Sequence, residues 1–274
     1  MARRRWRNGI CAVVLTGGLA LPAQAGDFDA VFQHYRDDDH AAALEGFRRL
    51  SEAGDAEATY WLGNMYFWGR GAGAGGAERD LEEAHRIWHP IAEGGDARAQ
   101  WRLGWMYRWG SGVEQDRAEA ARWYRRAADS GHTASMNDLG EMYLAGRGVD
   151  QDTDAAKALF LAATEAGHRA APHNLGRIFW TERHGLRDDT RAVHLFRISA
   201  ERGYGPAMRD LGHAHWQGRG GVERDLMEAL RLIVLSEDAG GGDSTRTLMR
   251  ILEEMTPEER AEADRLYEDW IAGE

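Results

Sequence analysis

The sequence contains one cysteine and one lysine, and each scarcity excludes a kind of chemistry. Cys11 lies within the first 25 residues, which are predicted below to be removed, so the mature chain would have no thiol, no disulfide and no thiolate metal site. Lys157 follows Asp154 by three positions and does not follow a serine there, so the Ser-x-x-Lys pattern of serine acyl-enzymes is absent.

An excess of basic residues is also missing. The formal net charge is -11 at pH 7, and removal of the first 25 residues, which include four arginines and no acid, would lower it by four to -15. Domains that bind nucleic acid or anionic membrane surfaces carry basic patches. The composition therefore argues against both as the main partner.

The apolar stretch near the N-terminus is too short to cross a bilayer. Ile10 to Leu21 is about a dozen residues, whereas a membrane-spanning helix needs about 20. The stretch follows the four arginines and precedes Ala23-Gln24-Ala25, which places small residues at the -3 and -1 positions before Gly26. This pattern predicts a signal peptide at 1–25, cleaved after Ala25, and a periplasmic or secreted protein with no stable membrane span.

No catalytic constellation stands out. The sequence has no Gly-x-Ser-x-Gly elbow, and its Gly-x-Gly segments are explained as helix-ending turns. His213 and His215 are two residues apart, which on a helix points them about 200° from one another, so they do not share a metal ion. We therefore expect no catalytic residue, no metal site, no cofactor and no enzymatic activity.

Internal repeats decide the predicted fold. Two markers, a glycine and a Leu-Gly pair, recur in step at spacings of 41, 36, 36 and 36 residues. The glycines are Gly54, Gly95, Gly131, Gly167 and Gly203, and the pairs begin at Leu62, Leu103, Leu139, Leu175 and Leu211. The longer first interval comes from a Gly/Ala-rich loop beginning at Gly71.

Each unit is predicted to contain two helices. In the third unit, Ala120, Trp123 and Ala127 mark one apolar face at helical spacing, and a second helix carries Leu139 and Met142. The Leu-Gly glycine lies inside this second helix, where glycine costs roughly 1 kcal/mol against alanine. Its recurrence predicts that a neighbouring helix packs too closely to allow a side chain.

The third unit resembles the Sel1-like repeat, a relative of the tetratricopeptide repeat. The residues that carry the resemblance are Ala121-Arg122-Trp123-Tyr124-Arg125-Arg126-Ala127-Ala128, Leu139-Gly140-Glu141-Met142-Tyr143 and Gly146-Arg147-Gly148-Val149. The resemblance covers about 27–240 and implies an all-α, right-handed superhelical solenoid of antiparallel helix pairs that acts as an adaptor. The fourth and fifth units depart from the pattern, with Ile178-Phe179 and Ala214-His215 where Met-Tyr is usual.

The ends of the chain are predicted to be caps, because the terminal units of a solenoid each have one unpaired face. We assign 26–54 to an N-terminal capping helix and the first repeat helix, 55–240 to the repeat solenoid and 241–274 to C-terminal capping helices. Thr256-Pro257 predicts the start of a final helix that extends through Trp270, with threonine as the N-cap and proline in the first turn.

Tryptophan is unusually frequent, with eleven in the chain. In the Leu-Gly helix of the second unit, Leu103, Met106 and Tyr107 are expected to face the core, which leaves positions 101, 105 and 108 on another face. We call these positions and their equivalents the predicted row, and we expect the row to line the concave surface. Its residues are Tyr60, Asn64, Phe67, Trp101, Trp105, Arg108, Asn137, Glu141, Leu144, His173, Arg177, Trp180, Arg209, His213 and Trp216.

The function predicted from these features is a non-catalytic scaffold of the bacterial cell envelope that binds a protein or peptide on the concave surface. Aromatic residues and arginine are typical of binding hot spots. The alternative is a cell-wall or small-ligand binder with weak, β-lactamase-like hydrolase activity; cysteine-rich relatives suggest it, but the missing cysteines and Ser-x-x-Lys argue against it. In a third interpretation the chain changes partners within a regulatory complex, with Gly71 to Gly76 as a mobile element.

Overall fold

The computed structural model describes residues 25–272, so residues 1–24 of the predicted signal peptide lie outside the described part of the chain. Every regular element in that part is a helix. In chain order they are α1 (Ala25–Arg36), α2 (His40–Glu52), α3 (Ala56–Trp68), α4 (Leu81–Glu93), α5 (Ala97–Trp109), α6 (Arg117–Asp129), α7 (Thr133–Ala145), α8 (Thr153–Glu165), α9 (Ala171–Trp180), the 3-10 helix η1 (Glu182–His184), α10 (Asp189–Glu201), α11 (Gly205–Gln217), α12 (Leu226–Asp238), α13 (Thr245–Glu254) and α14 (Pro257–Ala272).

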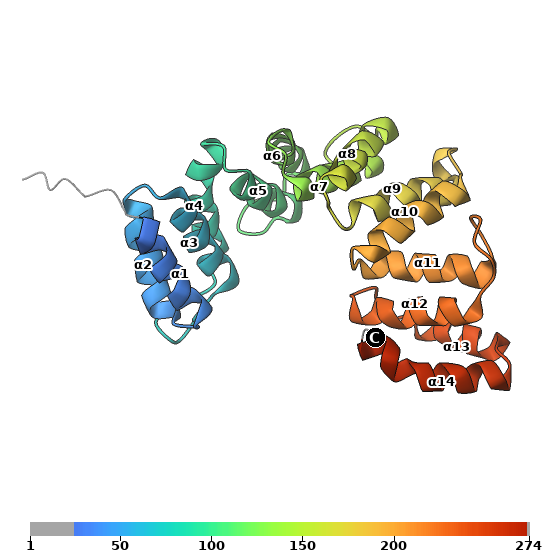
Figure 1. The fold of residues 1–274 in the computed structure, drawn as a ribbon. Coiled ribbons are helices and arrows are strands. Elements are labelled where there is room, and N and C mark those ends of the chain that lie inside the picture. The colour runs from blue at the N-terminus through green and yellow to red at the C-terminus, as the bar shows by residue number, and fades with distance from the viewer. Residues whose placement is uncertain (1–24, 273–274) are drawn as a thin grey trace, which may run out of the picture.

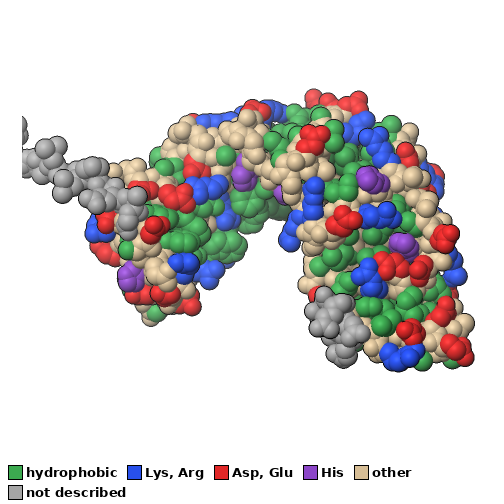
Figure 2. Space-filling model, in the orientation of Figure 1, with side chains coloured by type: hydrophobic (Ala, Val, Ile, Leu, Met, Phe, Trp, Pro, Cys, Tyr) green, Lys and Arg blue, Asp and Glu red, His purple; other side chains and the backbone are tan. Residues whose placement is uncertain are grey.

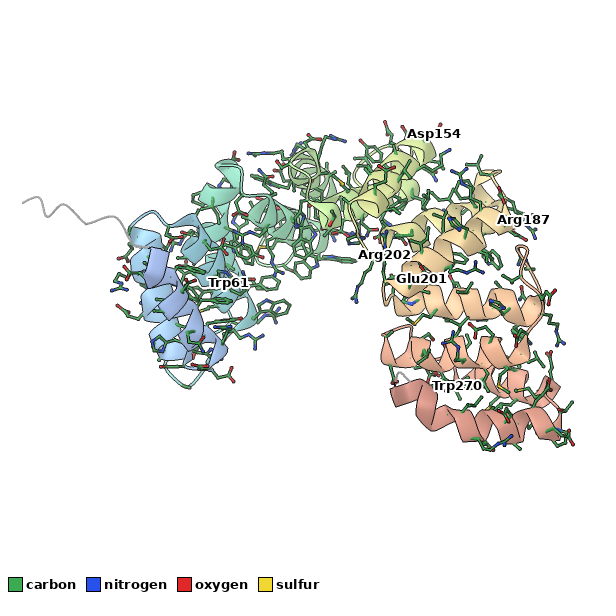
Figure 3. The ribbon with its side chains drawn as sticks, viewed as in Figure 1. Trp61, Asp154, Arg187, Glu201, Arg202 and Trp270 are labelled. Atoms are coloured by element: carbon green, nitrogen blue, oxygen red, sulfur yellow. The ribbon has the colours of Figure 1, made fainter. Side chains whose placement is uncertain are left out.

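The helices stack into an arch (Figure 1), which confirms the predicted all-α, right-handed superhelical solenoid of antiparallel pairs. The Leu-Gly helices α5 and α7 lie on the inner side of the arch, and α6 and α8 lie on its outer side (Figure 1). Figure 3 agrees, because Asp154 of α8 projects from the outer edge. Within 25–272 no helix is both long and apolar enough to cross a membrane.

Aspartate begins most of the helices and glycine ends most Leu-Gly helices. At α3, for example, the Asp55 carboxylate accepts a hydrogen bond from the Ala58 backbone N–H at 3.0 Å, which satisfies one of the N–H groups that a helix start leaves unpaired. The same helix ends at Gly69, whose φ of 64° lies in the left-handed region that favours glycine. The helix α9 differs from the other Leu-Gly helices. It has only 10 residues, and Thr181, which follows its last residue, has an extended backbone conformation in place of a glycine in the left-handed region.

The Leu-Gly glycines confirm the predicted close helix contact. A Cβ added at Gly140 would lie 2.7 Å from Cε1 of Phe160, and one added at Gly104 would lie 2.6 Å from Cδ1 of Tyr124. In both cases the intruding ring comes from the helix that follows the Leu-Gly helix. The tight pairs are therefore α5 with α6 and α7 with α8, so the sequence analysis was wrong to place the Leu-Gly helix second in its unit.

The two ends of the solenoid are covered by additional helices. At the N-terminus α1 packs on α2, with the rings of Phe28 and Phe47 centred 5.9 Å apart. At the C-terminus the predicted final helix is present, and Thr256 and Glu259 form a reciprocal capping box with hydrogen bonds of 2.7 and 3.2 Å. Of the C-terminal capping helices predicted at 241–274, only the last had predicted bounds, and α13 was not located from the sequence.

The Gly/Ala-rich loop that lengthens the first repeat is held by backbone hydrogen bonds. The amides of Ala74 and Gly76 both donate to the Gly71 carbonyl oxygen, at 2.9 and 3.1 Å. A Cβ at Gly71 would lie 2.5 Å from Cβ of His40, so the loop packs against the start of α2. These contacts give the loop one defined conformation in this structure.

Candidate functional site

The first position of the predicted row bridges consecutive Leu-Gly helices. Trp101 Nε1 of α5 donates to the Asp138 carboxylate of α7 at 2.7 Å, and His173 Nε2 of α9 lies 2.8 Å from the Asp210 carboxylate of α11. Between them, Asn174 Nδ2 donates to Asn137 Oδ1 at 2.9 Å. The three contacts join residues 37 positions apart, so they recur once per repeat and form a polar ladder along the Leu-Gly helices.

The structure distributes the fifteen residues of the predicted row unequally between interior and surface. Only Arg177 is exposed. Half-buried members are Trp101, Trp105, Arg108, Glu141, Leu144, Trp180, Arg209, His213 and Trp216. Five are buried, namely Tyr60, Asn64, Phe67, Asn137 and His173, and in this conformation they offer a partner little side-chain area. The binding role of the row stays a prediction.

A second face of the Leu-Gly helices is more accessible to solvent than the predicted row. It keeps the middle position of the row and moves the first and third positions by one residue each. It contains positions 102, 105 and 109 of α5 and their equivalents, and we call it the shifted stripe. Its residues are Trp61, Asn64, Trp68, Arg102, Trp105, Trp109, Asp138, Glu141, Ala145, Asn174, Arg177, Thr181, Asp210, His213 and Gln217. Periodicity within one helix identifies the face that packs on its partner in the pair, but it does not show which flank the next repeat covers. That is why the sequence analysis missed the outer positions.

The N-terminal part of the shifted stripe is aromatic and exposed. Trp68 and Trp109 occupy the same position in consecutive repeats and are 56% and 53% exposed. The Arg102 guanidinium lies 5.8 Å from the ring centre of Trp68 and 4.9 Å from that of Trp101, both within the range of cation–π interactions. Figure 2 shows hydrophobic side chains gathered on the inner side of this limb of the arch.

Charged groups on the ladder are partly desolvated, and the pKa values of two carboxyls respond in opposite directions. Burial raises the pKa of Asp138 to about 6, although the hydrogen bond from Trp101 and the nearby Arg108 act against it. Burial acts on Asp210 in the same sense and is the largest single influence, but the hydrogen bond from His173 together with the charge interactions of His173, Arg209 and His213 holds the pKa of Asp210 below its usual range. These groups position helices, and no cluster of three or more potential metal ligands occurs within 25–272.

Structural comparison shows which known proteins this chain is similar to. A Sel1 repeat protein from Oxalobacter formigenes aligns with a TM-score of 0.71 and 26% identity, over 80% of this chain and 84% of that chain. A protective antigen of uropathogenic Escherichia coli that displays an SLR fold aligns with a TM-score of 0.69 and 28% identity, over 90% of this chain. The alignment covers 53% of that antigen, so this chain spans about half its length.

More distant similarity extends to an immunity protein of Pseudomonas aeruginosa, with a TM-score of 0.53 and 17% identity over 81% of this chain and 85% of that chain, which shows the fold alone. A search of curated protein sequences finds no match.

The repeats themselves match a family model. The Sel1 repeat model matches five consecutive segments, 56–96, 97–132, 133–168, 171–204 and 205–240. Each segment begins with the Leu-Gly helix, in agreement with the helix pairs defined by the glycine contacts. Proteins of this kind generally act as protein–protein interaction scaffolds, and their fold is typically non-catalytic. Because the five segments cover well over half of its length, this chain belongs to the Sel1 repeat family.

Proposed function

We propose that this protein is a non-catalytic scaffold of the bacterial cell envelope that binds a protein or peptide on the concave side of its arch. The observation that carries the proposal is the exposure of Trp68 and Trp109 on two adjacent Leu-Gly helices, the first beside Arg102 and the second beside Arg108. Tryptophan and arginine dominate the energetics of protein interfaces, and exposed tryptophans at the same position of two consecutive repeats need a reason other than core packing. An envelope location rests on the sequence pattern of residues 1–25.

Helix order supports the choice of the concave side. The Leu-Gly helices α5 and α7 lie on the inner side of the arch, so a ligand along them would contact several repeats at once (Figure 1). Contacts between α3 and α5, where Arg98 pairs with Glu57 at 2.6 Å and Arg102 donates to Asn64 at 3.0 Å, would present the two exposed tryptophans on a preorganised surface.

The test uses Trp68→Ala combined with Trp109→Ala. Both side chains are more than half exposed, so the helices should retain their structure. Partners from envelope extract would be identified by mass spectrometry on immobilised wild-type protein, purified, and titrated against each variant by calorimetry. We expect the double variant to bind at least about 30-fold more weakly, which corresponds to a hot-spot loss of about 2 kcal/mol.

A matched control removes exposed apolar area elsewhere. Leu161 of α8 and Met249 of α13 are 48% and 59% exposed and lie outside the shifted stripe. Leu161→Ala combined with Met249→Ala should leave binding unchanged. Full affinity in the tryptophan variant, or a loss that circular dichroism traces to unfolding, would contradict the proposed surface.

A further inference from the structure

A basic cavity lies between α7 and α9, and the guanidinium of Arg108 in its lining lies 5.1 Å from the ring centre of the exposed Trp109. Its volume is about 410 Å³, and its polar lining includes Arg108, Glu141, Arg147, Arg177 and Arg183. The cavity also has an apolar part made by Met142, Phe160 and Ile178. Four arginines against one glutamate form an unusual concentration in a chain whose formal net charge is -11.

The single carboxylate of the cavity is already neutralised. Glu141 accepts a hydrogen bond from Arg108 Nη2 at 3.0 Å and another from Asn174 Nδ2 at 3.3 Å. The ion pairs formed within 25–272 include Arg108 but not Arg147, Arg177 or Arg183. Three guanidinium groups therefore line one cavity, and no carboxylate among the described side chains forms an ion pair with them.

The irregular fourth repeat builds this cavity. Arg183 lies 36 residues after Arg147 and so occupies the same repeat position, but η1 and the extended Thr181 replace the regular glycine turn there. Arg177 stands at the position that Glu141 occupies in the preceding repeat. Arg177 and Glu141 both line the cavity at the α7–α9 junction, so a basic residue replaces an acidic one from one repeat to the next.

We propose that this cavity binds the carboxylate side chain of an Asp or Glu in a peptide that lies along the Leu-Gly helices, with a neighbouring apolar side chain on Met142 and Ile178. The inference rests on the proposed scaffold function and names the chemistry of the partner at a second point on the same layer of helices. Guanidinium groups suit this role because they bind a carboxylate through two parallel hydrogen bonds.

The test uses an array of amidated peptides of random sequence, so that only side-chain carboxylates are present. We expect bound peptides to be enriched in Asp or Glu next to an apolar residue. For the peptide that binds best, replacement of Asp by Asn or of Glu by Gln should weaken binding about tenfold, as measured by fluorescence anisotropy. The protein variant Arg177→Ala combined with Arg183→Ala should weaken binding of the original peptide by a similar factor. A higher salt concentration should weaken binding of the acidic peptide and leave binding of its amide counterpart nearly unchanged.

The control changes net charge by the same amount elsewhere. Arg246 and Arg250 of α13 are exposed and lie outside the cavity, so Arg246→Ala combined with Arg250→Ala should bind the acidic peptide like wild type. The proposal would be overturned if the bound peptides showed no enrichment in Asp or Glu. It would also be overturned if the two double-arginine variants bound the acidic peptide with equal affinity. Either result would leave the scaffold function standing if the tryptophan variants still lose the envelope partner, so the two failures are distinguishable.

Discussion

The α3–α5 and α7–α9 junctions are built on the same repeat, yet they present different surfaces. At α3–α5 the Glu57 carboxylate pairs with Arg98 at 2.6 Å, and Arg102 donates a hydrogen bond to the Asn64 amide oxygen at 3.0 Å, while Trp68 remains exposed. At α7–α9 one glutamate faces four arginines around a cavity. The residues on the surface of the Leu-Gly helices therefore differ from repeat to repeat, whereas the helix pairs beneath them pack in the same way.

The largest expected effect tests whether both junctions depend on the same packing. Gly104→Val in α5 and Gly176→Val in α9 would place a side chain against Tyr124 and Phe196, whose nearest ring atoms lie 2.6 and 2.7 Å from an added Cβ. We expect each to lower the free energy of unfolding by about 3 kcal/mol and the melting temperature by several degrees in calorimetry.

Gly94→Ala is the matched control, because Gly94 has an ordinary φ of -69° and an added Cβ would lie 3.4 Å from its nearest neighbour. It should melt at or slightly above the wild-type temperature. If only one of the two valine variants were destabilised, the junctions would differ in packing as well as in surface.

An intermediate effect concerns pH, where Glu57 at the α3–α5 junction and Asp138, which joins α7 to α5, should respond in opposite directions. The hydrogen bond from Arg98 holds the pKa of Glu57 below its usual range, so its stabilising contribution is lost as pH falls through the folded-state pKa. Asp138 has a pKa raised to about 6, so the folded state binds more protons than the unfolded state between about pH 4 and 6, and stability decreases as pH rises through that window.

Urea denaturation of wild type and Asp138→Asn across this range isolates the contribution of Asp138. The wild-type free energy of unfolding, taken relative to the variant, should decrease by about 2 kcal/mol between pH 4 and pH 7, since the side chain is 21% exposed and the full shift is partly screened. A flat or rising difference would show that the carboxylate is adequately solvated.

The smallest effect compares two tryptophan donors. Trp101 Nε1 bridges to Asp138 in the next Leu-Gly helix at 2.7 Å, whereas Trp61 Nε1 donates to Glu57 of its own helix at 2.9 Å. Trp101→Phe should cost about 1 kcal/mol through the lost ladder contact, and Trp61→Phe about half as much. Equal losses in chemical denaturation would indicate that the ladder contributes no more than a contact within one helix.

Much of the architecture was predictable because the repeat makes local signals recur. The Leu-Gly glycines predicted close helix contacts, and Thr256-Pro257 predicted the start of α14, since both depend on backbone geometry that few residues satisfy. The order of helices within a unit was wrong, because a periodic sequence has no intrinsic starting point. Tertiary contacts such as that of Gly140 with Phe160 show which neighbour is the partner.

The predicted row shows which part of the candidate site could not be predicted from the sequence. Trp105, Glu141 and Arg177 were found because they lie opposite the core face of a single helix. His173 and Asn137 are buried by contacts with the next repeat, and nothing in the period of one helix encodes that flank. The sequence by itself determined the helices, their pairing distance and the solenoid, because these depend on local backbone and apolar periodicity. Tertiary structure decided which tryptophans remain exposed and where arginines meet around a cavity, because both depend on how successive repeats stack.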